Sequence, residues 1–209
     1  TFGDLLMELD KIGIPRIRFT TSHPHDLDDK TIEAYRTCKS LMPHLHLPVQ
    51  SGSNAVLKKM NRHYTKELYL DVIQKLREAK PDIALTTDLI VAFPTETEAD
   101  FQMTLDLVEQ VNFEGAYTFI FSKRAGTPAY HFEDTISEQE KKERLKRLNK
   151  VVNDGYLRHS QKYKDKIVEV LVEGTSKQDE RTLAGYSEHN KLVNFKGDKS
   201  LIGKIVKVK

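Results

Sequence analysis

The chain has 209 residues, a formal net charge of +2 and a single cysteine. This length allows one or two domains with enough core to fold, and the near-neutral charge commits the chain as a whole to no class of partner. One cysteine excludes a disulfide framework and a cysteine metal site made by this chain alone. No apolar run approaches the roughly 18 residues of a membrane span, and no signal peptide opens the chain, so we expect a cytoplasmic protein that meets no membrane.

Helices and strands alternate along the first two thirds of the chain. Hydrophobic periodicity predicts helices over 1–12, 28–38, 54–60, 65–79 and 98–111, and strands over 16–21, 44–50, 84–93 and 116–122. This order favours a parallel α/β sheet or barrel, in which the strands ending near Thr21, Gln50, Phe93 and Ser122 are adjacent. Right-handed crossovers then place the loops after these strands on one face, where the sites of barrels are found.

From residue 137 the pattern changes. Ser137 and Glu140 form a capping-box pattern, which predicts a long helix over 137–164. Four short strands after it, at 167–172, 181–186, 191–195 and 201–208, predict a small antiparallel barrel. We therefore expect a first domain over 1–136, a connecting helix over 137–164 and a second domain over 165–209. Residues 162–209 hold 11 Lys and Arg against 7 Asp and Glu, which favours nucleic-acid contact; a basic but inert barrel is the alternative.

The strand over 44–50 is followed by a pattern typical of a ligand cradle. Strand alternation places Leu45, Leu47 and Val49 on one face and His44, His46 and Gln50 on the other. Small residues at 51–53 let a ligand approach the backbone, and a short helix capped by Asn54 ends by presenting Arg62. Such a cradle suits an anionic, hydroxyl-rich ligand; an ordinary strand, turn and helix with a surface arginine is the alternative.

Three acidic positions in and after the next strand need an explanation. Asp88 lies inside an apolar strand, where a buried carboxylate is costly without partners. It is therefore either a ligand contact or a structural aspartate bonded to neighbouring backbone. Glu96 and Glu98 precede or begin the following helix, and we interpret both as charges placed at a helix N-terminus.

Several of these runs occur together in one known family. They are Arg16-Ile-Arg-Phe-Thr-Thr-Ser-His-Pro24, His44 to Ser53 with Leu57 to Arg62, Thr87 to Val91 with Phe93-Pro94, and Tyr117 to Pro128. The chain resembles the radical S-adenosylmethionine methylthiotransferases, in particular those that act on isopentenyl-adenosine in tRNA. Its terminal piece resembles the TRAM domain, an RNA-binding β-barrel. The resemblance implies an α/β fold: the C-terminal half of a radical SAM partial (β/α) barrel, followed by a small antiparallel β-barrel whose last strand is cut off.

The same resemblance implies S-adenosylmethionine as cofactor, held by Gln50, Ser51, Arg62, Asp88, Ile90 and Val91. Gln50 and Asp88 would hydrogen-bond the ribose hydroxyls, and Arg62 would pair with the methionine carboxylate. Ile90 and Val91 would flank the adenine. We expect substrate contacts from Ser122 and Arg124 after the last strand, and from Arg181 and Lys191 in the terminal barrel.

The resemblance also implies two 4Fe-4S clusters, whose ligands lie outside this chain. No metal-ligating or catalytic residue is then expected here. Cys38 lies among helical apolar positions and is expected to be a small buried side chain. Because the chain begins on a helix without an initiator methionine, we expect a fragment of a longer protein that is inactive alone. The whole protein would meet tRNA, S-adenosylmethionine and an electron donor.

The expected activity is addition of a methylthio group to C2 of isopentenyl-adenosine beside the tRNA anticodon. Two alternatives stay open: the same chemistry on threonylcarbamoyl-adenosine or a ribosomal-protein aspartate, and a non-catalytic RNA-binding module. The chain also departs from the family pattern. Ala92 and Thr95 stand where the family usually has glycines, and Lys123 stands where it commonly has proline. Because two glycines are replaced by residues with side chains, the sequence does not show whether the backbone can approach the adenine closely here.

Overall fold

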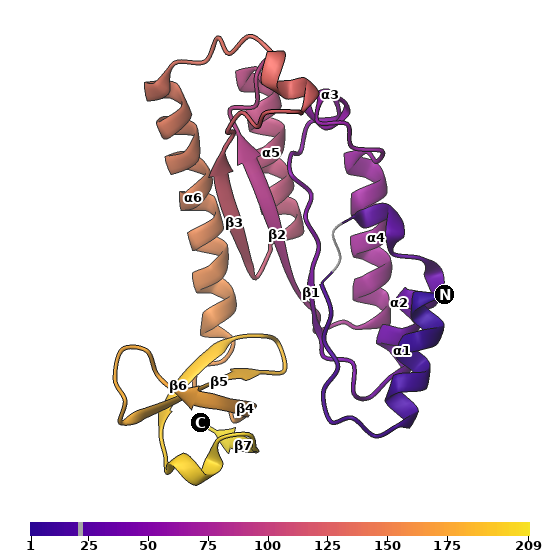
Figure 1. The fold of residues 1–209 in the computed structure, drawn as a ribbon, viewed down its shortest axis with the longest axis vertical. Coiled ribbons are helices and arrows are strands. Elements are labelled where there is room, and N and C mark those ends of the chain that lie inside the picture. Colours follow the sequence, from indigo (N-terminus) through magenta and orange to yellow (C-terminus); the bar gives the residue numbers. More distant parts are fainter. Residues whose placement is uncertain (21–22) are drawn as a thin grey trace.

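The computed structural model describes residues 1–20 and 23–209 and contains an α/β part and a small terminal sheet, joined by a long helix (Figure 1). Among these residues, no helix has the length and apolar character that crossing a membrane requires. The first part holds a parallel sheet of β1 (His44–His46), β2 (Ala84–Val91) and β3 (Gly115–Ile120), in the order β1-β2-β3. Asp88 pairs with Tyr117 in this register. The predicted parallel arrangement is thus confirmed for these three strands.

The segment before the sheet differs from the prediction. Over residues 16–20, the described part of the predicted strand, the chain makes two isolated parallel bridges, Ile17 with Leu41 and Thr20 with His46, and no continuous strand. The His44 N–H, which would continue this ladder, donates instead to the Met42 carbonyl at 2.7 Å, so the ladder is interrupted between the two bridges. Thr21, where that strand was expected to end, lies outside the described residues.

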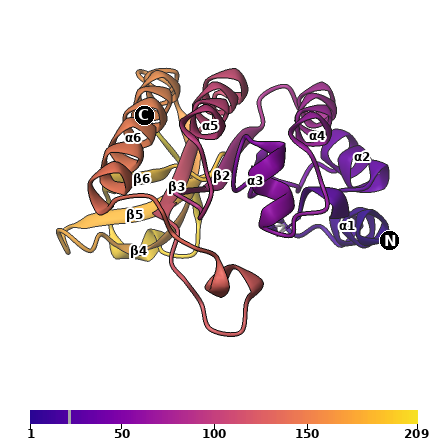
Figure 2. The same cartoon turned by 90° about the horizontal axis from the view of Figure 1, so that it is seen from above.

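The helices follow the predicted order. They are α1 (Phe2–Lys11), α2 (Asp29–Thr37), α3 (Asn54–Lys59), α4 (Lys66–Ala79), α5 (Glu98–Val111) and α6 (Glu138–Gln161), with 3-10 turns η1 (Pro24–Asp26), η2 (Pro128–His131) and η3 (Lys199–Leu201). Figure 2 shows α4, α5 and α6 along one side of the parallel sheet, as in a (β/α) barrel. On the opposite side of the sheet, side chains of β2 and β3 line the cleft described in the next subsection.

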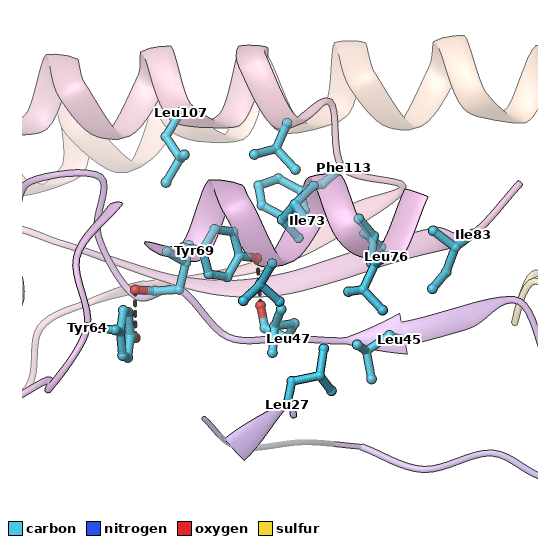
Figure 3. Packing of buried hydrophobic residues seen from close by; sticks show 14 of the residues in the cluster. Leu27, Leu45, Leu47, Tyr64, Tyr69, Ile73, Leu76, Ile83, Leu107 and Phe113 are labelled. Carbon is cyan, nitrogen blue, oxygen red and sulfur yellow. Dashed lines mark hydrogen bonds between the residues drawn. The ribbon is translucent and has the colours of Figure 1, made fainter. Parts of the chain in front are cut away.

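Core side chains hold the extended segment that follows β1, residues 47–49 (Figure 3). Leu45, Leu47 and Val49 are fully buried, as their alternation predicts. The hydroxyl of Tyr69 donates to the Leu47 carbonyl at 2.9 Å, and that of Tyr64 donates to the Val49 carbonyl at 3.0 Å. Two buried tyrosines therefore hold residues 47–49 in place and carry the chain to Gln50.

Helix α6 leads from the α/β part to the terminal sheet. Its N-cap Ser137 accepts from the Glu140 N–H at 3.2 Å, but the Glu140 carboxylate pairs with Arg144, so the predicted capping box is only half made. The terminal sheet contains β4 (Val168–Thr175), β5 (Thr182–Ser187), β6 (Leu192–Lys196) and β7 (Ile205–Val208), antiparallel in the order β6-β5-β4-β7. The antiparallel terminal fold is confirmed. Its last strand starts at 205 rather than 201 because η3 occupies 199–201.

Charged contacts attach the terminal sheet to the starting end of the parallel strands (Figure 1). Glu114, just before β3, contacts Lys191 Nζ and His159 Nδ1 through its two carboxylate oxygens, both at 2.8 Å. Arg16 and Arg18 donate to the carbonyls of Tyr186 and Ser187. These contacts place the terminal sheet at the opposite end of the parallel strands from the motif residues. In this contact region, burial lowers the pKa of His159, although the Glu114 carboxylate acts in the opposite direction.

Candidate functional site

A cleft with a volume of about 670 Å³ lies at the carboxyl ends of the parallel strands. This volume is within the range of small-molecule sites. Its walls come from the segment after β1, the end of α3, strand β2 and the loop after β3. They consist of Gln50, Lys59, Met60, Asn61, Arg62, Asp88, Ile90, Phe93, Phe119, Ile120, Phe121, Ser122, Arg124, Thr127, Pro128 and Ala129. Six of the ten predicted site residues are in this set.

Gln50 enters the cleft because its backbone turns there. Its N–H donates to the Asp88 carbonyl and its own carbonyl accepts from the Ile90 N–H, both at 2.9 Å. Between these bonds Gln50 has φ +70°, a left-handed conformation that is uncommon for a residue with a side chain. The two bonds hold Gln50 beside β2. Gln50 and Asp88 line the same cleft, as the strand order predicted.

Arg62 reaches the cleft through a second left-handed residue. Helix α3 is capped by Ser53, whose hydroxyl accepts from the Val56 N–H, and not by Asn54 as predicted. After the helix, Asn61 has φ +57° and the Arg62 N–H donates to the Leu57 carbonyl at 2.9 Å. This reversal directs the chain back over the strand ends. A Met-Asn-Arg sequence after a short helix is the signal that could have indicated such a turn.

Asp88 is accommodated in its apolar strand by a neighbouring histidine and by partial exposure. His46 Nε2 lies 3.4 Å from Asp88 Oδ1, and the Asp88 side chain is 29% exposed. The other ring nitrogen of His46, Nδ1, lies 3.0 Å from the Thr86 hydroxyl. His46 is thus fixed by Thr86 while it faces the carboxylate, and this open side of Asp88 is available to a ligand.

Two of the predicted cofactor residues do not reach the cleft. Val91 is fully buried in the core, because consecutive strand residues point to opposite faces and Ile90 takes the cleft side. Ser51 is also fully buried, with its hydroxyl 3.3 Å from that of Thr104 on α5. We correct both assignments: Val91 and Ser51 support the site from behind and do not line it.

The loop after β2 has the backbone conformation that suits glycine at the two positions where this chain has Ala92 and Thr95. Ala92 has φ +57° and Thr95 has φ +78°, a backbone region that glycine enters without steric cost. Thr95 accepts a hydrogen bond from Lys59 Nζ at 2.6 Å, and this lysine, which the sequence interpretation missed, lines the cleft. The loop therefore keeps the glycine-like path with two side chains added.

Glu96 is the second residue that the sequence interpretation missed. It is buried, and its Oε2 accepts from the Ala92 N–H at 2.7 Å and from Arg144 Nη1 at 2.8 Å. Burial raises the pKa of this carboxyl against the opposing effect of Arg144. Its interpretation as a helix N-terminal charge was wrong, whereas Glu98 does lie in the first turn of α5. The isolated carboxylate before the helix gave no sign of a partner 48 positions away.

The remaining predicted residues fall into two groups. Ser122 and Arg124 line the cleft beside the predicted cofactor residues. Arg181 is exposed just before β5. Lys191, just before β6, pairs with Glu114, and its Nζ lies 4.5 Å from the centroid of the Tyr156 ring. Cys38 is buried as expected, which raises the pKa of its thiol. Within residues 1–20 and 23–209, no group of three or more His, Cys, Asp or Glu is placed to hold a metal ion.

Comparison with known families defines the class of protein. The radical SAM superfamily model matches residues 1–108, just over half of the chain, and the TRAM domain model matches residues 161–209. The chain belongs to the radical SAM superfamily and carries a TRAM domain.

Within that superfamily the chain is similar to methylthiotransferases. It is 57% identical over 206 residues to the tRNA-2-methylthio-N(6)-dimethylallyladenosine synthase of Oceanobacillus iheyensis and 55% identical over 207 residues to that of Bacillus subtilis. These matches cover 99% of this chain but only 40% and 41% of the relatives, so the chain spans about two fifths of their length.

A solved structure supports the fold. The chain resembles coproporphyrinogen III oxidase from Escherichia coli, a radical SAM enzyme, with a TM-score of 0.59, 14% identity, and coverage of 97% of this chain and 60% of that one.

Proposed function

We propose that this chain is the part of a radical SAM enzyme that holds S-adenosylmethionine and tRNA, and that the whole enzyme adds a methylthio group to C2 of isopentenyl-adenosine beside the anticodon. One observation carries the proposal. Gln50, Arg62 and Asp88 converge on one cleft of small-molecule size in a chain more than half identical to enzymes named for this product.

The donor set of the cleft fits S-adenosylmethionine. The Arg62 guanidinium matches a carboxylate as a two-pronged donor, and the Asp88 carboxylate and Gln50 amide can accept from vicinal hydroxyls. Ile90 and Phe93 supply apolar wall for a planar base. Bound S-adenosylmethionine would supply the radical chemistry that removes hydrogen from the substrate carbon. The residues of this chain orient the cofactor for that chemistry.

Iron–sulfur clusters do not fit within this chain. Such clusters are held by several cysteine thiolates, and the one cysteine here, Cys38, is buried. We propose that the thiolate ligands of two 4Fe-4S clusters come from other parts of the whole protein, and that a separate electron donor reduces them. The 209-residue chain alone is then inactive.

The terminal sheet is proposed to bind tRNA in the cytoplasm. It carries an excess of basic residues, and the exposed Arg181 is suited to phosphate contact. Ser122 and Arg124, at the cleft, are proposed to contact the substrate near the reacting base. We do not extend this role to Lys191, because its ammonium is already held by Glu114.

The test uses the full-length enzyme with its clusters reconstituted. It is offered three substrates: an anticodon stem-loop with isopentenyl-adenosine, the same RNA with threonylcarbamoyl-adenosine, and a ribosomal-protein peptide containing aspartate. Mass spectrometry should find the methylthio product on the first only. A product on either other substrate assigns the enzyme to a different branch of the family. Tight RNA binding without 5′-deoxyadenosine formation on any substrate would leave a non-catalytic binding module.

A second arm tests the terminal sheet. Deleting residues 166–209 should weaken tRNA binding and remove much of its salt dependence, while 5′-deoxyadenosine formation without tRNA continues. Equal tRNA affinity in the truncated enzyme would contradict the role of the terminal sheet without touching that of the cleft.

A further inference from the structure

Two large aromatic side chains stand exposed next to the cleft. Tyr117 is 65% exposed and Phe119 is 50% exposed, although both lie in the regular strand β3. Because side chains alternate along a strand, the two rings share one face. On the opposite face, Ala116 and Ile120 pack against the core, and the Thr118 hydroxyl donates to Asn149 of α6 at 2.6 Å. Ile120, at the end of the strand, also borders the cleft.

Register places this aromatic face directly beside the proposed cofactor residues. Tyr117 pairs with Asp88, and Phe119 pairs with Ile90 and itself lines the cleft. His46 lies on β1, on the other side of Asp88 from Tyr117 in the strand order. The His46 and Tyr117 rings nevertheless pack edge-to-face, with centroids 5.8 Å apart. The aromatic face is therefore continuous with the cleft.

The charges around this face identify the kind of occupant. The cleft it adjoins holds three cationic side chains, Lys59, Arg62 and Arg124. None of the ion pairs found among residues 1–20 and 23–209 involves Arg62 or Arg124. A flat apolar surface next to positive charge complements a nucleotide, whose base is planar and whose phosphates are anionic.

We propose that Tyr117 and Phe119 form a stacking platform for the target adenine base, extruded from its RNA loop, while Arg124 and Lys59 face the flanking phosphates. This inference rests on the proposed function, because it assumes an RNA substrate. It adds two residues of β3 as substrate-positioning groups. The platform places the base against the cofactor cleft, since Phe119 belongs to both surfaces.

The test measures stacking directly in the full-length enzyme. An anticodon stem-loop carrying 2-aminopurine at the target position is titrated, and its fluorescence, which stacking quenches, is followed together with affinity. Tyr117→Ala and Phe119→Ala should each weaken binding about tenfold and reduce the quenching, since a stacked base contributes about 1–3 kcal/mol. Tyr117→Phe keeps the ring and should behave as wild type. Met103→Ala removes a side chain that is 43% exposed on α5 and is the matched control.

Two results would overturn the platform. In the first, wild-type enzyme binds the RNA and both alanine variants bind and quench it equally well. In the second, the alanine variants leave quenching intact but lower the melting temperature by several degrees, which would mean that another part of the protein covers this face. Failure of the wild-type enzyme to bind RNA at all would instead contradict the proposed function.

Discussion

Glu96 and Arg144 form a buried ion pair between the loop after β2 and helix α6: Arg144 Nη1 donates to Glu96 Oε2 at 2.8 Å, and each residue is only 3% exposed. Arg144 also donates to the Glu96 carbonyl at 3.0 Å. Because the same carboxylate oxygen accepts from the Ala92 N–H, the pair holds the turn that leads to Phe93 in the cleft wall. Helix α6 thereby supports the cleft from outside.

Removing one partner of this pair should strongly destabilise the fold. Arg144→Leu leaves the Glu96 carboxylate buried without its cation, a loss of about 3–5 kcal/mol. Glu96→Gln keeps a hydrogen-bond acceptor and should cost less. Urea unfolding of the 209-residue chain measures both. The control is Arg147→Leu, which breaks the exposed pair with Glu98 and should cost at most about 1 kcal/mol. Equal losses for Arg144→Leu and Arg147→Leu would contradict the role given to burial.

Arg62 and Asp88 should govern cofactor affinity in the full-length enzyme. Arg62→Ala removes a charge-assisted hydrogen bond, a loss of about 1.5–3 kcal/mol or roughly ten- to a hundredfold in affinity. Asp88→Asn exchanges one acceptor for a donor and should have a smaller effect than Asp88→Ala. S-adenosylmethionine binding and 5′-deoxyadenosine formation are the measurements.

Lys58→Ala provides the matched control for Arg62→Ala. Lys58 is an exposed cation of the same short helix α3 and does not line the cleft. Its removal should leave affinity unchanged. Wild-type affinity for S-adenosylmethionine in both Arg62→Ala and Asp88→Ala would show that neither side chain contacts the cofactor.

Restoring glycine at Thr95 should stabilise the chain. Thr95 is exposed, and a residue with a Cβ at φ +78° costs about 1–2 kcal/mol. The greater freedom of glycine in the unfolded chain and the lost hydrogen bond from Lys59 offset part of the gain. We expect Thr95→Gly to raise the free energy of unfolding by about 0.5–1 kcal/mol. Ala99→Gly, in the exposed first turn of α5, should lower it. A loss of stability in both variants would show that the left-handed turn carries no strain.

Acid should destabilise the chain partly through His44. Burial, with a smaller effect of Arg18, lowers the pKa of His44 to about 4, against 6.5 in the unfolded chain. The unfolded state therefore binds the extra proton first, and stability falls as pH drops from about 6.5 to 4, by at most about 3 kcal/mol. Below pH 4 this group contributes no further change. His44→Gln should flatten the profile in this window, whereas the exposed His131→Gln should not.

The terminal sheet should loosen when Glu114 loses its charge. Glu114→Gln removes the carboxylate that pairs with Lys191 and His159. We expect faster hydrogen exchange over 182–196, while the parallel sheet stays protected. Glu180→Gln, at an exposed position of the same domain, is the control. Unchanged exchange in Glu114→Gln would mean that the carbonyl contacts of Arg16 and Arg18 suffice to hold the terminal sheet.

The sequence by itself determined the order of the elements, the buried face of the strand at 44–49 and the convergence of Gln50 and Asp88. These follow from short-range rules, because helix and strand periods decide which side chains share a face and right-handed crossovers decide which strand ends share an edge. The same alternation already implied that Ile90 and Val91 cannot both enter the cleft.

Only the tertiary structure decided the contacts between distant segments. The partners of Glu96 and Lys191 lie 48 and 77 positions away in the chain, and no local period links such residues. The left-handed turns at Gln50 and Asn61 depend on hydrogen bonds to β2 and α3, and the exposure of Tyr117 and Phe119 depends on which face of β3 helix α6 covers. Packing and long-range hydrogen bonding settle these features, because each depends on how complete elements meet and not on their local residue patterns.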